Sequence, residues 1–228
     1  PMTFCGQTIN TSYISGACTH PDFRDKGVMR ELLAEAFGRM HTQGVLLSTL
    51  IPAEPWLFDY YARSGYAPIF NVCATTFKSA PATTLPSDYQ MTDTDSFTQQ
   101  LYTCFEHKMR QRPCCIQHTT DDFKVILADL QLSGGRVHLL HHAQRSEVAA
   151  LAFTYPDEKG GLLISELLAD SNKEASLLLQ HICQTNGQTE LRLLRPVSEN
   201  EKGERLGMGR IIHAHALLQL YAATHPDE

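Results

Sequence analysis

The segment with the clearest chemical potential is Ala17-Cys-Thr-His-Pro-Asp-Phe-Arg-Asp-Lys-Gly-Val-Met-Arg30, where a polar turn leads into a helical pattern that begins near Gly27. The first N–H groups of a helix lack intrahelical partners and the helix dipole adds partial positive charge, so this end suits a phosphate or pyrophosphate. Gly27 lets the backbone approach an anion without a Cβ, and Arg24, Lys26 and Arg30 add positive charge. The alternative is an ordinary solvated turn, because helix N-termini attract anions generically.

A second candidate is the tyrosine that opens Tyr61-Ala-Arg-Ser-Gly-Tyr66, near the end of a short helical stretch. A phenol has an ordinary pKa of about 10 and a thiol one of about 8.5, so a tyrosine hydroxyl facing a cleft could protonate a departing thiolate. The alternative is a packed aromatic ring whose hydroxyl is satisfied within the protein. The residue types alone leave both interpretations open.

Together, the two segments resemble the GNAT superfamily of N-acetyltransferases. The superfamily fingerprint Q/R-x-x-G-x-G/A stands here as Arg24-Asp25-Lys26-Gly27-Val28-Met29, and Phe58-Asp-Tyr-Tyr-Ala-Arg-Ser-Gly-Tyr66 resembles its later tyrosine-bearing motif. The order P-x-x-R-x-x-G-x-x-R, a strand, then Y-x-R-x-G-Y is most similar to the enhanced-intracellular-survival branch, which has two tandem GNAT folds followed by a sterol-carrier-like domain. The resemblance covers nearly the whole chain, with specific motifs only in residues 13–66.

The resemblance implies that acetyl is transferred from acetyl-coenzyme A to a primary amine of a small molecule or of a lysine. The backbone of residues 17–19 would pair with the pantetheine arm, residues 25–30 would hold the pyrophosphate, and residues 53–54 would make further cofactor contacts. Tyr61 would act as general acid toward the leaving thiolate, and the general base stays open between Glu54 and a water. The implied cofactor-binding residues are Ala17, Cys18, Thr19, Arg24, Asp25, Lys26, Gly27, Val28, Met29, Arg30, Ala53 and Glu54.

Two departures from the family pattern bear on function. Met29 replaces the small residue that ends the fingerprint and could crowd the pyrophosphate, which motivates the alternative of a non-catalytic coenzyme A-binding or protein-interaction module. In the second half of the chain, Ala169-Asp-Ser-Asn-Lys-Glu174 follows the run Leu162–Leu168 without R-x-x-G. We therefore expect the second half to bind no cofactor and to act as a scaffold or as a wall of the acceptor site.

Neither a metal site nor a cysteine nucleophile is expected. The pairs Cys114-Cys115, His141-His142 and His213-x-His215 have neither C-x-x-C nor H-E-x-x-H spacing. The seven cysteines are odd in number and irregularly spaced. They indicate a reduced, cytoplasmic protein whose thiols are mostly small core residues, Cys18 included.

The elements that must position these residues form an α/β (α+β) pattern. We expect tandem GNAT-like mixed sheets flanked by helices, with the first copy truncated at its N-terminus. Residues 1–80 would form the partial GNAT domain with the acetyl-CoA motif, 81–207 a degenerate second GNAT-like domain, and 208–228 the start of a third domain or a tail. The predicted strands are residues 3–9 and 11–18 (as a hairpin), 45–50, 66–77, 136–142, 148–155, 162–168 and 190–197. The predicted helices are residues 28–40, 56–64, 96–110, 121–132 (with Asp121 and Asp122 as candidate N-caps) and 172–186.

Composition excludes several other classes of protein. The chain has 228 residues, 43% of them hydrophobic, and a net charge of -6 from 19 basic and 25 acidic residues, an ordinary globular mixture. The acidic balance argues against nucleic-acid binding, and no run approaches the roughly 18 apolar residues of a membrane span. The Pro1 start and the polar tail at 224–228 suggest a fragment. An incomplete first fold would expose a sheet edge and favour pairing with a second copy.

Overall fold

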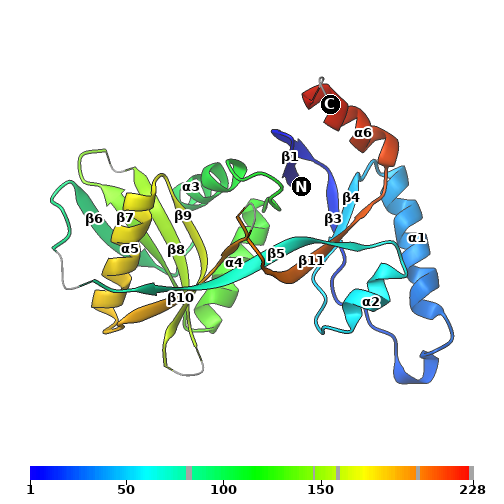
Figure 1. Ribbon diagram of the computed structural model, residues 1–228, viewed down its shortest axis with the longest axis horizontal. Coiled ribbons are helices and arrows are strands. Elements are labelled where there is room, and N and C mark those ends of the chain that lie inside the picture. Colours follow the sequence, from blue (N-terminus) through cyan, green and yellow to red (C-terminus); the bar gives the residue numbers. More distant parts are fainter. Residues whose placement is uncertain (81–83, 146, 158–159, 199–200, 226–228) are drawn as a thin grey trace. The chain divides into compact units, whose positions relative to one another are not determined.

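The computed structural model describes residues 1–80, 84–145, 147–157, 160–198 and 201–225 (Figure 1). The chain folds into two compact units: unit 1 contains residues 1–71, 113–116 and 204–228, and unit 2 contains residues 72–112 and 117–203. This division differs from the predicted ranges 1–80, 81–207 and 208–228, because everything from Glu204 onward belongs to unit 1. Parts of the predicted linker (81–83) and of the polar tail (226–228) lie outside the described residues.

Unit 1 contains a mixed sheet in the strand order β3-β4-β11-β5, and a separate antiparallel hairpin of β1 and β2. β3 pairs with β4 in parallel, and β11 pairs with β4 antiparallel. The elements are β1 (Met2–Phe4), β2 (Gln7–Ile9), β3 (Thr11–Tyr13), a single 3-10 turn (Pro21–Phe23), α1 (Val28–Thr42), β4 (Leu47–Leu50), α2 (Leu57–Ala62), β5 (Ala67–Lys78, which continues into unit 2), β11 (Glu204–Ile211) and α6 (Ala214–Thr224).

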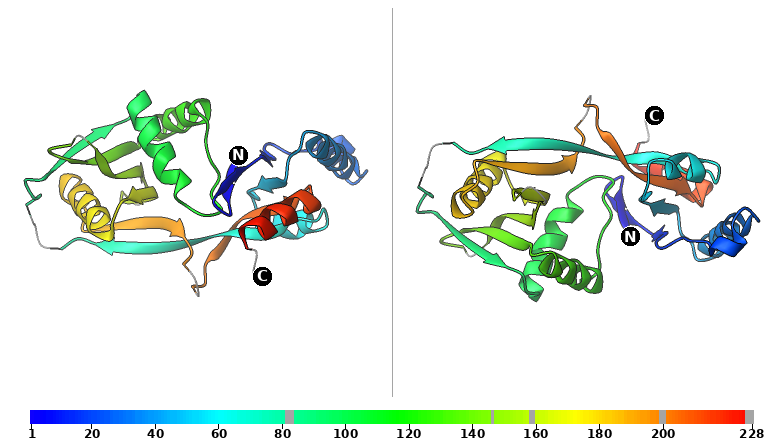
Figure 2. Two further views of the ribbon diagram at one scale, coloured as in Figure 1. Left: turned by 90° about the horizontal axis from the view of Figure 1, so that it is seen from above. Right: turned by 90° about the horizontal axis from the view of Figure 1, so that it is seen from below.

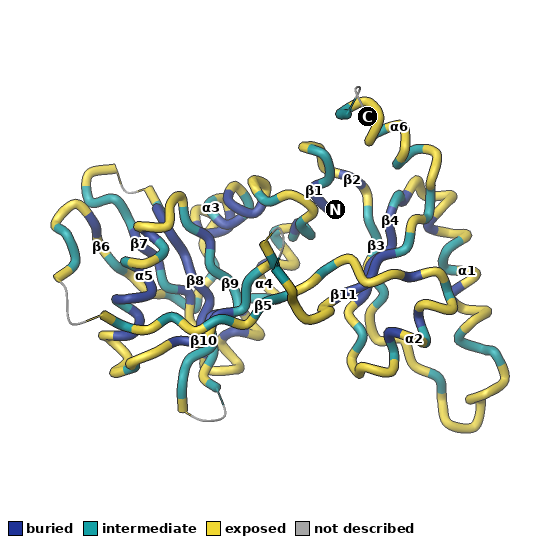
Figure 3. Tube along the Cα trace, in the orientation of Figure 1, coloured by how far each residue is buried: buried dark blue, intermediate teal, exposed yellow. Residues whose placement is uncertain are grey.

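The two faces of β4 organise the core of unit 1. Successive side chains of a strand point to opposite faces, and the four residues of β4 are all buried (Figure 3). Leu47 belongs to a cluster that takes in β1, β2 and α6, including Met2, Ile9 and Leu217. On the other face, Leu50 packs with residues of α1, α2, β11 and the turn before β5, namely Leu33, Phe58, Tyr61, Met208 and Tyr66.

Glycines set both ends of α1. Gly27 precedes the helix with φ of 80°, a left-handed conformation that favours glycine. Gly44 follows the C-cap with φ of 70°, the usual conformation of a helix-terminating glycine. The predicted helix over residues 28–40 is confirmed and extends to Thr42.

The predicted hairpin between residues 3–9 and 11–18 is wrong. The turn lies at Cys5-Gly6 inside the first run, and both residues have positive φ. β3 pairs in parallel with β4 instead, and it ends at Tyr13 rather than at Cys18. The last bond joins the Ile14 N–H to the Thr49 carbonyl at 2.9 Å, after which Gly16 turns the chain away with φ of 64°.

The segment interpreted as a junction, Gly207–Ile212, lies largely within a strand of the unit 1 sheet. β11 is inserted between β4 and β5, and its glycines allow close packing. A Cβ on Gly209 would lie 2.3 Å from Ile69 Cδ1, and one on Gly207 would lie 3.2 Å from the Leu50 carbonyl oxygen. Small residues at alternate positions of β11 therefore permit its insertion.

Unit 2 has a sheet covered by helices on both faces (Figure 2). The strand order is β5-β10-β9-β8-β7-β6, with only β9 and β10 parallel. Ala150 and Ala152 of β8 pack with α5, whereas the neighbouring Phe153 stacks on Phe105 of α3 and contacts Phe123 of α4. The elements are β6 (Tyr89–Thr94), α3 (Gln99–Arg110), α4 (Thr120–Leu132), β7 (Arg136–His142), β8 (Val148–Pro156), β9 (Leu162–Ala169), α5 (Asn172–Thr185) and β10 (Glu190–Pro196).

These two units confirm the predicted class of mixed sheets flanked by helices. In the described part of the chain, no helix combines the length and the apolar character that crossing a membrane requires.

Candidate active site

The two predicted site segments leave the sheet of unit 1 at the same edge. β3 and β4 are parallel neighbours, with Ser12 opposite Ser48 and Tyr13 opposite Thr49. Residues at the carboxyl ends of parallel strands lie close together, and ligands of open α/β sheets bind there. The loop after β3 leads to α1, and the loop after β4 leads to α2, which carries Tyr61.

The loop before α1 has the backbone shape of an anion site. His20 Nδ1 accepts a hydrogen bond from the Asp22 N–H at the 3-10 turn, and Asp25 and Gly27 both have positive φ. Gly27 is the N-cap residue and provides no side-chain hydrogen bond to the first turn of α1. The first N–H groups of a 15-residue helix are thus left for an external acceptor.

Three basic side chains surround this helix start. Arg24 Nε donates to the Thr19 carbonyl at 3.3 Å, and Lys26 Nζ donates to the Asp22 carbonyl at 2.8 Å. The Arg30 guanidinium lies beside Gly27, 3.4 Å from the position of a Cβ there. All three side chains are exposed. Arg24 and Lys26 hydrogen-bond to backbone carbonyls, and Lys26 Nζ also lies 5.2 Å from the centroid of the Phe23 ring, so neither charge pairs with a carboxylate among the described residues.

Residues 17–19 occupy a different local structure from the one expected. They were predicted at the end of a strand, but β3 ends at Tyr13 and they lie in the loop that follows. Ala17 and Cys18 are exposed and Thr19 is half-buried. Tyr13 and Ile14 are the last residues that pair with or bond to β4 before the two strands separate.

Met29 does not crowd the helix start. Its side chain is half-buried against the cluster around Leu33 and Tyr61. Val28, its neighbour, is also half-buried. The thioether therefore belongs to the core beneath the helix rather than to the surface around Gly27.

Ala53 and Glu54 lie in the exposed loop between β4 and α2. The Glu54 carbonyl accepts a hydrogen bond from the Leu57 N–H at 3.0 Å, so this loop sets the start of α2. The Glu54 side chain is exposed, on the loop that leads to the helix bearing Tyr61.

Tyr61 is 8% exposed and lies in the aromatic part of the core. Its ring packs edge-on against Tyr60, with centroids 5.4 Å apart, and against Tyr66, with centroids 5.9 Å apart. Burial, and secondarily the neighbouring Tyr60, raises the pKa of the Tyr61 phenol above 10, so it stays protonated at neutral pH. Among the described residues its hydroxyl has no hydrogen-bond partner, whereas the Tyr66 hydroxyl lies 2.7 Å from Ser48 Oγ.

Sequence reasoning missed the residues that surround Tyr61 from other elements. Ser48 of β4 holds Tyr66. Arg210 of β11 donates from Nη1 to the Ser64 carbonyl, and its Cζ lies 4.1 Å from the centroid of the Phe37 ring. Neither contact leaves a local signal, because the partners are far apart in sequence.

Unit 2 also contains a parallel strand pair, β9 and β10, but the backbone groups of β9 beyond this pairing are already hydrogen-bonded to side chains. β9 and β10 pair at Leu163 and Ile164 only. Further along β9, the Leu167 N–H donates to Glu166 Oε1, and the Leu167 carbonyl accepts from Arg112 Nη2 at 2.8 Å. Arg112 and Glu166 also form an ion pair at 2.7 Å. The backbone groups that an extended ligand would use are therefore already bonded.

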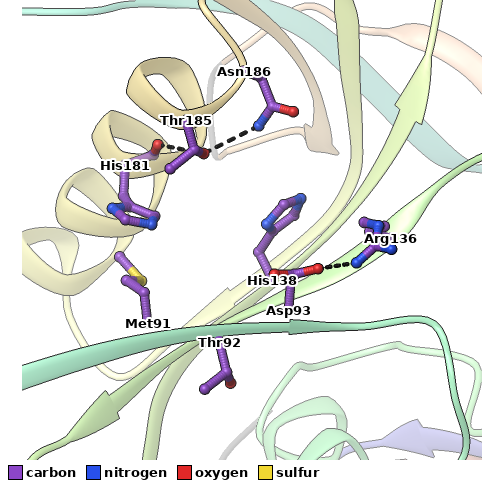
Figure 4. Close-up of a pocket in the computed structure, with 8 residues that line it drawn as sticks. All are labelled: Met91, Thr92, Asp93, Arg136, His138, His181, Thr185 and Asn186. Atoms are coloured by element: carbon purple, nitrogen blue, oxygen red, sulfur yellow. Dashed lines mark hydrogen bonds and ion pairs between the residues drawn. The ribbon is translucent and has the colours of Figure 1, made fainter.

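A separate cavity of about 270 Å³ lies in unit 2 between β6, β7 and the end of α5 (Figure 4). Burial lowers the pKa of His138 and of His181 below 6.5, so both imidazoles are neutral at pH 7. An ion pair between Asp93 and Arg136 lies at its rim. None of these residues was predicted to be functional. The lining residues are Met91, Thr92, Asp93, Arg136, His138, His181, Thr185 and Asn186.

The cysteines differ from the predicted core thiols. Only Cys183 is buried, while Cys18 and Cys114 are exposed and the other four are half-buried. Within the described ranges, no group of three or more potential ligand side chains is arranged to hold a metal ion.

Comparison with known proteins defines the class of this fold. Residues 1–69 match the model of the acetyltransferase (GNAT) domain family, and they include α1, β4 and α2 with the site described above. Residues 1–69 are therefore similar to a GNAT acetyltransferase domain. A search of curated proteins finds no match.

Three solved structures share the fold over nearly all of this chain. A conserved Enterococcus faecalis protein described as a probable N-acyltransferase matches with a TM-score of 0.75 and 14% identity, covering 92% of this chain and 56% of its own. A GCN5-related N-acetyltransferase from Anabaena variabilis has a TM-score of 0.71 and 14% identity, covering 93% and 58%. Eis1 from Mycobacterium abscessus has a TM-score of 0.71 and 12% identity, covering 96% and 60%. The chain thus spans less than two thirds of the length of these structures.

Proposed function

We propose that this chain contains the catalytic site of an acetyl-CoA-dependent N-acetyltransferase that acetylates a primary amine, with Tyr61 as general acid. The observation that carries the proposal is the position of Tyr61. It is a buried, protonated phenol whose hydroxyl has no partner among the described residues, and it follows the loop after β4, the parallel neighbour of the strand that leads to the uncapped N-terminus of α1. The GNAT match over the same residues supports it.

The residues present fit coenzyme A. The diphosphate would be held by the first N–H groups of α1, with Asp25–Arg30 and Arg24 around it, where Gly27 leaves room for the backbone to approach. The pantetheine arm would follow the chain from Tyr13 through Ala17–Thr19 after β3 and β4 separate, with Ala53 and Glu54 on the opposite loop. The cofactor supplies the thioester.

The acetyl transfer has three requirements. The amine must be neutral to attack, the oxyanion must meet a donor, and the thiolate must leave protonated. The raised pKa of Tyr61 keeps its proton available for the third step. Glu54 or a water acts as the base, and the acceptor is the amine of a small molecule or of a lysine. Exposed thiols at Cys18 and Cys114 fit a reducing compartment, so we place the reaction in the cytoplasm.

The test is thiol release from acetyl-CoA with a panel of amines, comparing wild type with Tyr61→Phe. We expect kcat to fall about 10²- to 10⁴-fold, the usual contribution of a general acid, while the KM for acetyl-CoA changes little. Tyr60→Phe is the matched control, because Tyr60 is the adjacent tyrosine on the same helix. Equal turnover in wild type and Tyr61→Phe would refute the assigned role.

The alternative is a non-catalytic coenzyme A-binding or interaction module, which Met29 motivated. Packing of the Met29 side chain in the core removes that reason. Calorimetry with acetyl-CoA separates the two: binding without turnover on any amine would favour the alternative. No binding at millimolar ligand would contradict both.

A further inference from the structure

Arg210 lies on the face of β11 that points toward Tyr61. Met208, two residues earlier on that face, is fully buried in the same cluster as Tyr61 and Tyr66. From there the Arg210 guanidinium reaches the turn after α2, where Nη1 donates to the Ser64 carbonyl. A Cβ on Gly65 would lie only 2.5 Å from Nη1, so glycine is needed for this approach.

The turn that Arg210 holds is bonded to the backbone of Tyr61. The N–H of Ser64 donates to the Tyr61 carbonyl at 2.9 Å, and the N–H of Tyr66 donates to the same carbonyl at 3.3 Å. A continuous series of bonds thus runs from the guanidinium of Arg210 through Ser64 to Tyr61. The donor and the turn are 146 residues apart in the sequence.

No carboxylate among the described residues pairs with the charge of Arg210. Its buried Nε has no hydrogen-bond partner within the described residues either. The guanidinium lies over the Phe37 ring instead. Its positive charge lowers the pKa of the Tyr66 phenol, although burial raises that pKa by more. Arg210 as a whole is half-buried, and leaving its buried Nε without a hydrogen-bond partner is costly. Such a charge stabilises any negative charge that develops nearby.

We propose that Arg210 is a positioning residue for Tyr61: it fixes the turn that ends α2 and places a positive charge beside the Tyr61–Tyr66 pair. This inference rests on the proposed function of Tyr61. When Tyr61 gives its proton to the leaving thiolate, the resulting phenolate packs edge-on against Tyr66, the phenol on which the charge of Arg210 already acts. Strand β11 would therefore complete a site whose other proposed parts lie in residues 13–66.

The first test needs no activity. Amide hydrogen exchange of the segment containing Ser64, Gly65 and Tyr66 is compared between wild type and Arg210→Met. We expect exchange there to accelerate about tenfold or more, because a charge-assisted hydrogen bond is lost. Arg205→Met is the matched control, since Arg205 also lies on β11 and over an aromatic ring, that of Phe58. Unchanged exchange in Arg210→Met, or equal acceleration in the control, would overturn the proposal.

The second test is kinetic. Arg210→Met should lower kcat about 10- to 100-fold, the cost of a small misplacement of a reacting group, with the KM for acetyl-CoA within about twofold; Arg210→Lys should recover part of kcat. If Arg210→Met fails to fold by circular dichroism, Arg210→Lys takes its place in both tests. Faster exchange in a chain inactive on all amines would contradict the proposed function but support the control of the turn by Arg210. An unchanged kcat in an active chain would contradict a role in positioning.

Discussion

Three neighbouring tyrosines show how environment separates chemistry from packing. Tyr66 is 3% exposed, and its hydroxyl is committed to Ser48. Tyr60 is half-buried and packs against the core cluster that contains Tyr66. Tyr61 alone among them combines burial with a hydroxyl that no described residue binds. The proposed acid is therefore distinguished by what its oxygen lacks rather than by its position in a motif.

At the same scale, Gly65 and Gly44 form a matched pair of left-handed glycines. Both end a helix of unit 1, with φ of 80° and 70°. Gly44 has nothing within 4 Å of an added Cβ, whereas Gly65 has the Arg210 guanidinium at 2.5 Å. We expect Gly44→Ala to cost about 1–2 kcal/mol, the strain of a left-handed Cβ. Gly65→Ala should cost about 1.5–3 kcal/mol more, because it also displaces the Arg210 hydrogen bond.

Fluorescence of the single tryptophan measures this difference. Trp56 lies in unit 1 at the start of α2, so its signal in urea reports the unfolding of that unit. Equal losses in the two variants would mean that Arg210 moves aside without cost.

At the scale of elements, α4 begins with a reciprocal cap. The Thr119 hydroxyl accepts from the Asp122 N–H, and the Asp122 carboxylate accepts from the Thr119 N–H at 2.8 Å. Asp122 was a candidate N-cap in the sequence, but the structure makes Thr119 the N-cap and Asp122 its partner. Thr119→Ala should lower the free energy of unfolding by about 1 kcal/mol, as measured by urea unfolding followed by circular dichroism.

The Asp122 side of this cap predicts a pH dependence. The hydrogen bonds from the backbone and side chain of Thr119 lower the pKa of Asp122 below 3.8 in the folded state. Its contribution to stability is therefore complete above pH 3.8 and is lost as the pH falls below that value. Asp122→Asn should destabilise the protein at pH 7, and its difference from wild type should shrink as the pH falls below 3.8. A constant difference across that range would contradict this account.

Local signals predicted the elements that carry them. Gly27, Gly44 and Gly187 mark helix ends that follow directly from backbone sterics, and the periodicity of β7 and α5 gave their ranges almost unchanged. The hairpin at Cys5-Gly6 was misplaced because Cys5 adopts positive φ, which its residue type does not announce. β11 was missed as a strand because its partners, β4 and β5, precede it by more than a hundred residues.

The residues of the candidate site also fall into those with a local signal in the sequence and those without one. Gly27, the basic residues around it and Tyr61 were predictable, because motif and helix chemistry are local. Arg210 and Ser48 were not, because their roles depend on which side chain the fold places opposite them.

At the scale of the whole molecule, the two units predict one cofactor per chain. Unit 1 presents an uncapped helix start next to separating parallel strands. In unit 2 the corresponding edge at Leu167 is bonded to Arg112 and Glu166. Calorimetric titration with acetyl-CoA should give a stoichiometry near one, and Gly27→Val should abolish binding, since a branched side chain is strained at φ of 80°.

Arg112→Ala provides the complementary measurement. It should leave the binding in unit 1 unchanged, because Arg112 belongs to unit 2. Two sites in wild type, or binding that survives Gly27→Val, would show that unit 2 holds the cofactor as well.

The late position of β11 in the sequence has a consequence for synthesis on the ribosome. The strand that fills the place between β4 and β5 begins at Glu204, whereas the preceding part of unit 1 ends at Asn71, apart from the short segment 113–116. At about 5–20 residues per second, the roughly 130 intervening residues take on the order of 7 to 26 s to emerge. During that interval the nascent N-terminal segment cannot close its sheet, although all of unit 2 has become available for folding. The residues of unit 1 that precede unit 2 are thus completed only after unit 2 has emerged, and a chaperone would be needed at the unpaired edge of β4.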